Sequence, residues 1–163
     1  VLKSTEILKY LNYKINDSHI KTGLNNVSNN TGLQGRWQVI QRKPMIICDT
    51  AHNEAALGEV ISQLMDMEYS DLHFIIGFSN DKNLKKISKI FPEDSKYYFV
   101  QSKVGRARDA KEVRDIFKLN NRCGDYYKSI ENTINYVKGV SKEDDIIFIG
   151  GSTFVVSEIF EKN

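Results

Sequence analysis

The sequence predicts an α/β fold, Rossmann-like, in which helices cover both faces of a largely parallel sheet. Short runs composed mostly of Ile, Phe and Val, such as "MIIC", "HFII" and "IIFI", alternate with segments whose apolar residues recur at helical spacing. Strands that are apolar almost without interruption are typical of sheets buried on both faces. The composition, 40% hydrophobic and 27% charged over 163 residues, is that of a globular domain.

Residues 1–34 have a different pattern from the rest of the chain. Apolar residues recur at three- and four-residue spacing across residues 1–20, which predicts a helix there. The following stretch, "TGLNNVSNNTGLQGR", is rich in Gly, Asn, Ser and Thr, residues that favour turns and loops. We therefore expect a linker here and a main domain over residues 35–163.

The elements of that domain are expected in alternating order. A hairpin is predicted from "RWQVIQ" and "PMIICD", followed by strands at "DLHFIIGF", "KYYFVQS" and "DDIIFIGG". The stretch "CGDYYKS" has no clear pattern. Amphipathic helices are expected between the strands and at the end, and their core-facing residues are Leu57, Val60, Ile61 and Leu64; Leu84, Ile87 and Phe91; Ala110, Val113 and Phe117; Ile130, Ile134 and Val137; and the apolar residues of "STFVVSEIFEK".

Composition and charge disfavour several classes of protein. The formal net charge is +2 and the basic residues are dispersed, so a nucleic-acid surface is not expected. No apolar run approaches the ~20 residues of a membrane span, and no signal-peptide pattern is present, so we expect a cytoplasmic location. Cys48 and Cys123 are expected to be free thiols, and the three histidines lack metal-ligand spacing. The polar start without Met suggests a piece of a longer protein.

Polar residues follow four of the predicted strands, in the segments 49–53, 77–82, 102–108 and 150–153. In an open parallel sheet, ligands bind at the carboxyl ends of the strands, where these segments should converge. Simpler explanations exist for each segment. Asn53 and Asp81 could be helix N-caps, Arg106 and Arg108 could be solvated, and the two glycines of the last segment could form a tight turn.

Several nucleotide and hydrolase motifs are absent from the sequence. There is no G-x-x-x-x-G-K-[ST], so the chain carries no P-loop for phosphates, and no G-x-G-x-x-G follows the first strand. No G-x-S-x-G nucleophile elbow occurs either. From its residues alone, the sequence therefore indicates a ligand-binding α/β domain with polar strand ends and no more specific function.

Three segments in order resemble a known family. "GRWQVIQRKPMIICDTAHNEAA", "GFSNDKN" and "IFIGGSTFVVSEI" are similar to the C-terminal domain of folylpolyglutamate synthase/dihydrofolate synthase, within the Mur ligase superfamily. That family shows Gly-Arg before a short strand, then Asp-Gly-Ala-His-Asn-Pro, Gly-x-x-x-Asp-Lys and a late Gly-Ser. The resemblance covers residues 35–163, and its departures are local, with Thr50 in place of Gly and Glu54 in place of Pro.

The resemblance implies an ATP-dependent ligase. Such an enzyme phosphorylates a pteroate or folate carboxylate and then joins it to L-glutamate, whose amine attacks the acyl phosphate. The P-loop and the ligands of Mg²⁺ would lie in an N-terminal ATPase domain of the same protein. Residues 1–20 would be the tail of that domain, and the Asn- and Gly-rich segment would be the interdomain linker.

The resemblance also implies roles for individual residues. Arg36 and Asp49 match the ATP-contacting Arg and Asp of the family, and a guanidinium suits phosphate oxygens. His52 matches the motif His, expected as the catalytic residue near the phosphates or the incoming glutamate. Candidates for holding the glutamate carboxylates are Lys82 and Ser152, with Arg106 as a further candidate for substrate or interface contact. No metal ligand is expected in this chain.

Two alternatives remain open at this point. Another ligase of the Mur type would use the same acyl-phosphate chemistry with a different acceptor. A non-catalytic module of the receiver type would use Asp49 as phospho-acceptor and Lys82 as its partner, although that type needs an acidic cluster after its first strand, which is not evident here.

Overall fold

The computed structural model describes residues 1–161, which divide into two compact units between Gln34 and Gly35. The first unit contains three helices, α1 (Leu2–Tyr10), α2 (Asp17–Asn25) and α3 (Val27–Thr31). The predicted single helix therefore ends early, and most of the stretch expected to form turns and loops is helical. Polar side chains support these helices instead of breaking them, because Asn16 accepts a hydrogen bond from the His19 N–H at 2.9 Å as N-cap of α2.

The second unit alternates strands and helices from residue 38 onwards. Its strands are β1 (Gln38–Arg42), β2 (Met45–Cys48), β3 (Leu72–Ile76), β4 (Lys96–Val100), β5 (Gly124–Tyr127) and β6 (Ile146–Gly150). Its helices are α4 (Glu54–Met65), α5 (Leu84–Ile87), the short 3₁₀ helix η1 (Ser88–Ile90), α6 (Ala110–Lys118), α7 (Ile130–Val140) and α8 (Thr153–Phe160).

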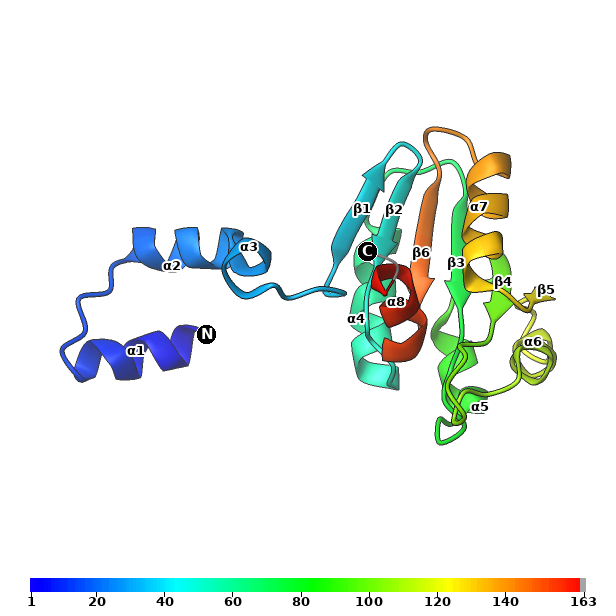
Figure 1. Ribbon diagram of the computed structural model, residues 1–163, viewed down its shortest axis with the longest axis horizontal. Helices are drawn as coiled ribbons and strands as arrows, with labels where there is room; N and C mark the ends of the chain where they lie inside the picture. The colour runs from blue at the N-terminus through cyan, green and yellow to red at the C-terminus, as the bar shows by residue number, and fades with distance from the viewer. Residues whose placement is uncertain (162–163) are drawn as a thin grey trace. The chain divides into compact units, whose positions relative to one another are not determined.

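The six strands form one sheet in the order β1-β2-β6-β3-β4-β5 (Figure 1). Only the β1–β2 hairpin is antiparallel, and all other pairs are parallel. The last strand, β6, returns between β2 and β3, so the direction in which the chain adds strands reverses there. Such a reversal point is where open α/β sheets bind ligands, at the carboxyl ends of the strands.

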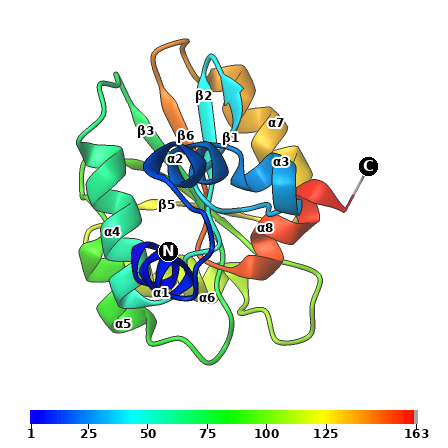
Figure 2. The same ribbon diagram turned by 90° about the vertical axis from the view of Figure 1, so that its left-hand side faces the viewer.

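Helices cover both faces of the sheet, as the two views in Figures 1 and 2 show. Helices α4, α5 and α6 pack with Ile47, Phe74 and Phe148 in one core cluster. Helices α7 and α8 pack with Ile75 and Ile149 in the other. The two clusters arise because successive residues of a strand point to opposite faces, so a fully apolar strand supplies both cores.

The predicted elements of this unit are confirmed, with one omission. Strand β5 was not predicted, because it pairs only with β4 at the edge of the sheet and two of its residues, Asp125 and Tyr126, are exposed. An edge strand lacks the apolar run that marks the central strands. The predicted final helix extends to residue 162 and the predicted domain to residue 163, and these two residues lie outside the described part of the chain.

Within residues 1–161, no helix combines the length and apolar character needed to cross a membrane.

Candidate functional site

A cavity of about 230 Å³ lies at the carboxyl edge of the sheet. The segments that follow β2, β3, β4 and β6 all contribute to it. This confirms the expectation that polar strand ends converge, and four of the predicted site residues meet here. The lining residues are His52, Ser79, Asp81, Lys82, Arg106, Ser152, Thr153 and Phe154.

His52 is held in one orientation by the chain that precedes it. Its Nδ1 lies 2.9 Å from the carbonyl oxygen of Thr50. A carbonyl oxygen only accepts hydrogen bonds, so Nδ1 carries the proton and Nε2 is left with a free lone pair. The imidazole can therefore accept a proton at Nε2.

The next residue, Asn53, is the N-cap of helix α4. Its side chain accepts a hydrogen bond from the Ala56 N–H at 2.9 Å, so the simpler explanation of this residue as an N-cap is confirmed.

Lys82 and Asp81 form an ion pair at the cavity. The Lys82 ammonium lies 2.7 Å from the Asp81 carboxylate, and this hydrogen bond lowers the pKa of Asp81. The prediction that Asp81 caps the next helix is wrong, since α5 begins after Asn83. The Lys82 side chain is only 24% exposed, so the ammonium is partly withdrawn from water and its attraction for an anion is stronger than at an open surface.

Arg106 reaches the cavity from the segment that follows β4. Its guanidinium lies over the ring of Phe154, 4.6 Å from the ring centroid. This cation–π contact fixes the plane of the guanidinium while leaving its N–H groups available for an anion. Phe154 belongs to the first turn of α8, so Arg106 and the start of that helix form one wall.

Ser152 is the N-cap of helix α8. Its Oγ accepts a hydrogen bond from the Phe154 N–H at 3.2 Å, and the residue is 4% exposed. The turn before it needs glycine at position 151, because Gly151 has φ +84° and a Cβ there would lie 2.8 Å from the carbonyl oxygen of Gly77. The predicted tight turn at the two glycines is thus confirmed, and a polar residue begins α8. The hydroxyl hydrogen of Ser152 remains available as a donor.

Arg108 fixes the loop that carries Lys82. Its guanidinium donates to the carbonyl oxygens of Asn80 and, at 3.3 Å, Lys82, and it pairs with Glu112 at 2.8 Å. Its side chain is 15% exposed, so the interpretation of this arginine as solvated is wrong. No sequence pattern predicts this role, because the contacts join segments that lie 26 and 28 residues apart.

Arg36 and Asp49 do not line the cavity and lie beside the first strand pair. Asp49 is 6% exposed, and its two oxygens accept from the N–H groups of Trp37 and Ala51, each at 2.7 Å. Arg36 is exposed and forms no ion pair with any other residue between 1 and 161. The carboxylate therefore shapes the turn that presents Arg36.

That turn depends on Gly35. The residue has φ +68°, and a Cβ would lie 2.8 Å from Cγ1 of Val156 and 2.9 Å from Cγ2 of Thr50. Its carbonyl oxygen accepts from the Thr50 N–H at 2.9 Å. The Gly-Arg pair is therefore pressed against the end of β2 and helix α8, and any side chain at position 35 would force them apart.

The neighbouring Cys48 is an unpaired thiol, as is Cys123, and both expectations are confirmed. Cys48 is completely buried, and this burial, followed by the charge of Asp49, raises the pKa of its thiol to about 12. A thiol that stays protonated at neutral pH is a poor nucleophile. Cys48 is thus part of the core and not of the reactive site.

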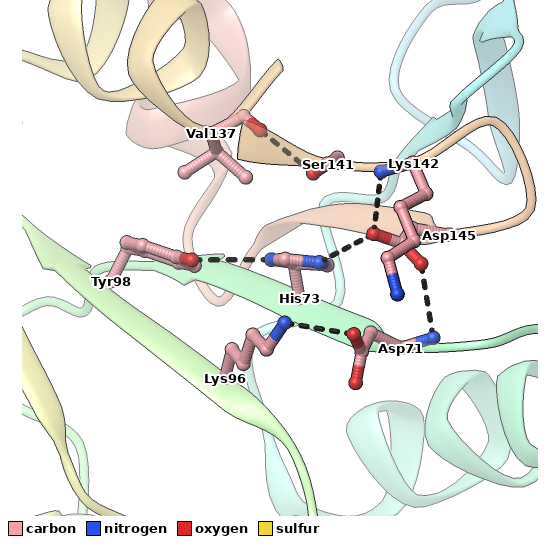
Figure 3. A network of polar contacts seen from close by, with 8 residues as sticks. All are labelled: Asp71, His73, Lys96, Tyr98, Val137, Ser141, Lys142 and Asp145. Atoms are coloured by element: carbon pink, nitrogen blue, oxygen red, sulfur yellow. Dashed lines mark hydrogen bonds and ion pairs between the residues drawn. The ribbon is translucent and has the colours of Figure 1, made fainter. Parts of the chain in front are cut away.

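A second polar network lies at the opposite, amino edge of the sheet (Figure 3). His73, fully buried, contacts Asp145 through Nε2 and the Tyr98 hydroxyl through Nδ1, both at 3.2 Å. The ligand atoms of Asp71, His73 and Asp145 lie within 4.8 Å of one another, close enough to hold a metal ion. Both imidazole nitrogens are already bonded, however, and Asp71 pairs with Lys96 at 2.8 Å. We therefore interpret the network as structural.

Some cavity residues have roles that the sequence did not predict. Ser79 was within a segment named as polar, but no role was assigned to it, and Phe154 was counted only as a helix residue. Position directly after a strand is the signal that could have identified Ser79. For Phe154, the contact with Arg106 depends on two segments almost 50 residues apart, which a single sequence does not reveal.

Comparison with known proteins gives consistent results. Residues 35–153 match the family model described as Mur ligase, glutamate ligase domain. The dihydrofolate synthase/folylpolyglutamate synthase of Buchnera aphidicola subsp. Schizaphis graminum is 28% identical over 155 residues, covering 93% of this chain and 35% of that protein. The Bacillus subtilis protein of the same name is 23% identical over 148 residues, covering 89% and 33%. The chain thus spans about a third of the length of these relatives.

Solved structures show the same fold. The bifunctional folylpolyglutamate synthase/dihydrofolate synthase of Yersinia pestis CO92 superimposes with a TM-score of 0.79 at 20% identity, covering 96% of this chain and 36% of that one. A structure of a bifunctional enzyme of that name, with Mn, AMPPNP and L-glutamate bound, gives a TM-score of 0.81 at 20% identity, with 96% and 37% covered. Given the match of the family model to most of its length, the chain belongs to the Mur ligase family, glutamate ligase domain.

Proposed function

We propose that the chain is the C-terminal part of an ATP-dependent ligase that joins L-glutamate to dihydropteroate, reduced folates or both. Membership of the glutamate ligase domain family supports an acid–amino-acid ligase. The relatives named dihydrofolate synthase/folylpolyglutamate synthase support the folate acceptor. A related structure that holds L-glutamate and AMPPNP, a nucleotide analogue, supports the two small substrates.

The charges around the cavity are the observation that carries this proposal. Lys82 and Arg106 supply two cations, and Asp81 supplies one carboxylate. L-Glutamate has two carboxylates and one ammonium group, so by replacing the Lys82–Asp81 ion pair it gives each of these three charges a partner. A neutral amino acid would leave one cation of the site without a partner, which costs free energy if that cation is the partly buried Lys82.

His52 is the residue that we propose to act in the chemical step. A carboxylate oxygen of the pteroate or folate first attacks the γ-phosphorus of ATP, which gives an acyl phosphate and ADP. The ammonium group of glutamate first gives one proton to water; its amine nitrogen then attacks the acyl carbon, the C–O bond to phosphate breaks, and an amide forms with loss of a second proton. Nε2 of His52 has the free lone pair and the place in the cavity to accept that proton.

Arg36 and Asp49 are proposed to serve ATP. Arg36 fits this role, because its guanidinium is exposed and unpaired among residues 1–161 and can bind phosphate oxygens. Asp49 fits mainly by holding the turn that presents Arg36, since backbone N–H groups already occupy both of its oxygens. When bound, ATP would supply the phosphoryl group, while Arg36 would orient and neutralise it.

The residues of the cavity do not fit Mg²⁺, an ion that prefers several oxygen ligands. Asp81 is the one carboxylate among the lining residues, and it is already paired with Lys82. We propose that Mg²⁺ and a P-loop belong to an N-terminal ATPase domain of the same protein, a cytoplasmic enzyme, and that residues 1–34 are its tail and the linker. The coverage of only about a third of the relatives supports this arrangement. Accordingly, the 163-residue chain alone should not hydrolyse ATP or form an amide, and turnover by it would contradict the assignment.

A Mur-type ligase with another acceptor is the second candidate, because the family match alone does not specify the acceptor. The receiver-type alternative loses its basis, since the Asp49 carboxylate is buried and fully engaged by backbone N–H groups.

The test uses the full-length parent protein with Mg-ATP, L-glutamate and either dihydropteroate or a reduced folate, and follows incorporation of labelled glutamate. Incorporation with one acceptor or both is the expected result, and the preferred acceptor names the activity. A folded parent that incorporates no glutamate with either acceptor would contradict the folate assignment. A panel of other carboxylate acceptors would then test whether the protein is a Mur-type ligase with a different acceptor.

A further inference from the structure

We infer that Ser79 is an additional substrate-binding residue, whose hydroxyl donates a hydrogen bond to a carboxylate of the amino acid held by Lys82 and Arg106. The inference rests on the proposed function and refines it, because it adds a second neutral donor, beside the Ser152 hydroxyl, to the charged groups of the site. Three observations support it: the burial of Ser79, its free hydroxyl and its rigid backbone.

Ser79 is 7% exposed and lines the cavity together with Lys82 and Arg106. A buried hydroxyl normally has a hydrogen-bond partner inside the protein. The Ser79 hydroxyl forms no hydrogen bond with any of residues 1–161. Its oxygen is not fully enclosed, because among the described residues the only fully enclosed side-chain polar atom without a partner is Nε of Arg108. Its oxygen therefore opens on the cavity, where a ligand can supply the missing bond.

Two other buried serines accept hydrogen bonds from groups of the protein itself. The Ser88 hydroxyl accepts from the side-chain amide of Asn120 at 2.9 Å, and the Ser152 hydroxyl accepts from a backbone N–H at the start of α8. Each of these hydroxyls satisfies a group of the protein itself. Ser79 satisfies none of the described groups, so its burial at the cavity has no structural explanation of this kind.

The backbone around Ser79 is held from both sides. Ser79 forms an antiparallel bridge with Ala107, and its carbonyl oxygen accepts from the Lys82 N–H at 3.2 Å. The neighbouring N–H of Asn80 donates to the Arg106 carbonyl at 3.0 Å, and that of Arg108 donates to the Phe78 carbonyl at 2.8 Å. These bonds tie the segment that carries Ser79 and Lys82 to the segment that carries Arg106. The backbone positions of the three donor residues are thus fixed before any ligand arrives, which favours tight binding.

The chemistry of this set favours a carboxylate. An ammonium and a guanidinium provide charge, and a neighbouring hydroxyl can direct its hydrogen to the same anion without adding a further charge. The same carboxylate can then be held by a hydroxyl and a cation, which fixes its orientation more strictly than charge alone.

The experiment compares the full-length parent protein with its Ser79→Ala variant in the glutamate-incorporation assay, with KM for L-glutamate and kcat determined separately. Ser102→Ala is the matched control, because Ser102 is 5% exposed, forms no side-chain hydrogen bond among residues 1–161, and lines a different cavity. We expect KM for L-glutamate to rise about 10-fold or more in Ser79→Ala, the size of effect of one hydrogen bond to a charged group. We expect kcat to stay within about twofold, Ser79→Thr to restore most of the affinity, and Ser102→Ala to match the wild type.

An unchanged KM in Ser79→Ala, with the wild type active, overturns the inference and leaves the proposed function intact. A wild type that forms no amide overturns both. Should Ser79→Ala fail to fold, Ser79→Cys, which keeps the shape and weakens the hydrogen bond, is measured in the same way, and a wild-type KM there overturns the inference equally.

Discussion

The carboxylate of Asp49 accepts a hydrogen bond from the backbone N–H of Trp37 at 2.7 Å, across 12 residues of chain. Trp37 has φ +41°, an uncommon value for a residue with a side chain, and it directly follows Arg36. The acid at the end of β2 thus holds the turn before β1 in a conformation that it would not adopt alone.

We predict that Asp49→Asn destabilises the protein by about 1–3 kcal/mol, because the amide has one acceptor oxygen for two buried N–H donors. Chemical denaturation of the chain measures the change. Asp66→Asn, at an exposed position after α4, is the control and should leave the stability unchanged. An Asp49→Asn variant as stable as the wild type would show that the two hydrogen bonds contribute little.

Lys82→Gln in the full-length protein should raise KM for L-glutamate about 10-fold or more, because a partly buried cation is replaced by a neutral amide. The control is Lys86→Gln, at an exposed position on α5. Steady-state kinetics with glutamate as the varied substrate provide the comparison. Equal KM values for the two variants would remove Lys82 from the proposed glutamate site.

His52→Gln should lower kcat by about 10²–10⁴-fold while changing KM for L-glutamate little, because the amide cannot accept the proton that Nε2 is proposed to take. Single-turnover amide formation from acyl phosphate, measured at saturating glutamate, isolates the step. His19→Gln, at an exposed position in α2, is the control and should be neutral. A wild-type rate in His52→Gln would mean that another group, or water, takes the proton.

Gly35→Ala should destabilise the chain by about 1–3 kcal/mol, because the residue combines φ +68° with side-chain carbons 2.8 and 2.9 Å from the new Cβ. Gly58→Ala provides a contrast inside helix α4, where a Cβ meets no atom within 4 Å and should stabilise by about 0.5–1 kcal/mol. Thermal or urea unfolding of both variants tests the pair. Similar effects in both would contradict the close packing at Gly35.

The stability of the chain should fall as the pH is lowered through about 6.5. Burial, opposed by the hydrogen bond to Asp145, lowers the pKa of His73 below the unfolded value of 6.5, so the unfolded chain binds a proton that the folded chain does not. The loss begins near pH 6.5 and continues down to the folded pKa. The charged or titratable groups around the imidazole are Asp71, Lys96, Tyr98, Lys142 and Asp145.

Urea unfolding of the wild type and of His73→Gln between pH 7.5 and 5.5 measures this dependence. The glutamine can bond Asp145 and Tyr98 without titrating, so its stability should change less over that range. Equal slopes for the two proteins would assign the pH dependence to other groups.

The sequence determines the fold class through patterns found within single strands and helices. Apolar runs such as Ile46–Cys48 require burial on both faces, and the spacing of Leu57, Val60, Ile61 and Leu64 places them on one face of α4, where they are buried. The meeting of His52, Lys82, Arg106 and Ser152 also followed from the sequence, because parallel strands bring their carboxyl ends to one edge.

Other features were decided only by tertiary contacts. Strand β5 is a strand because it pairs with β4 at the edge of the sheet. The contacts of Arg108 with Asn80 and Lys82 and the hydrogen bond from Trp37 to Asp49 join residues far apart in the chain, and only the fold places Ser79 at the cavity. Residue types and spacing determine which groups reach an edge of the sheet, but only packing in three dimensions determines which of them are already engaged and which remain free for a ligand.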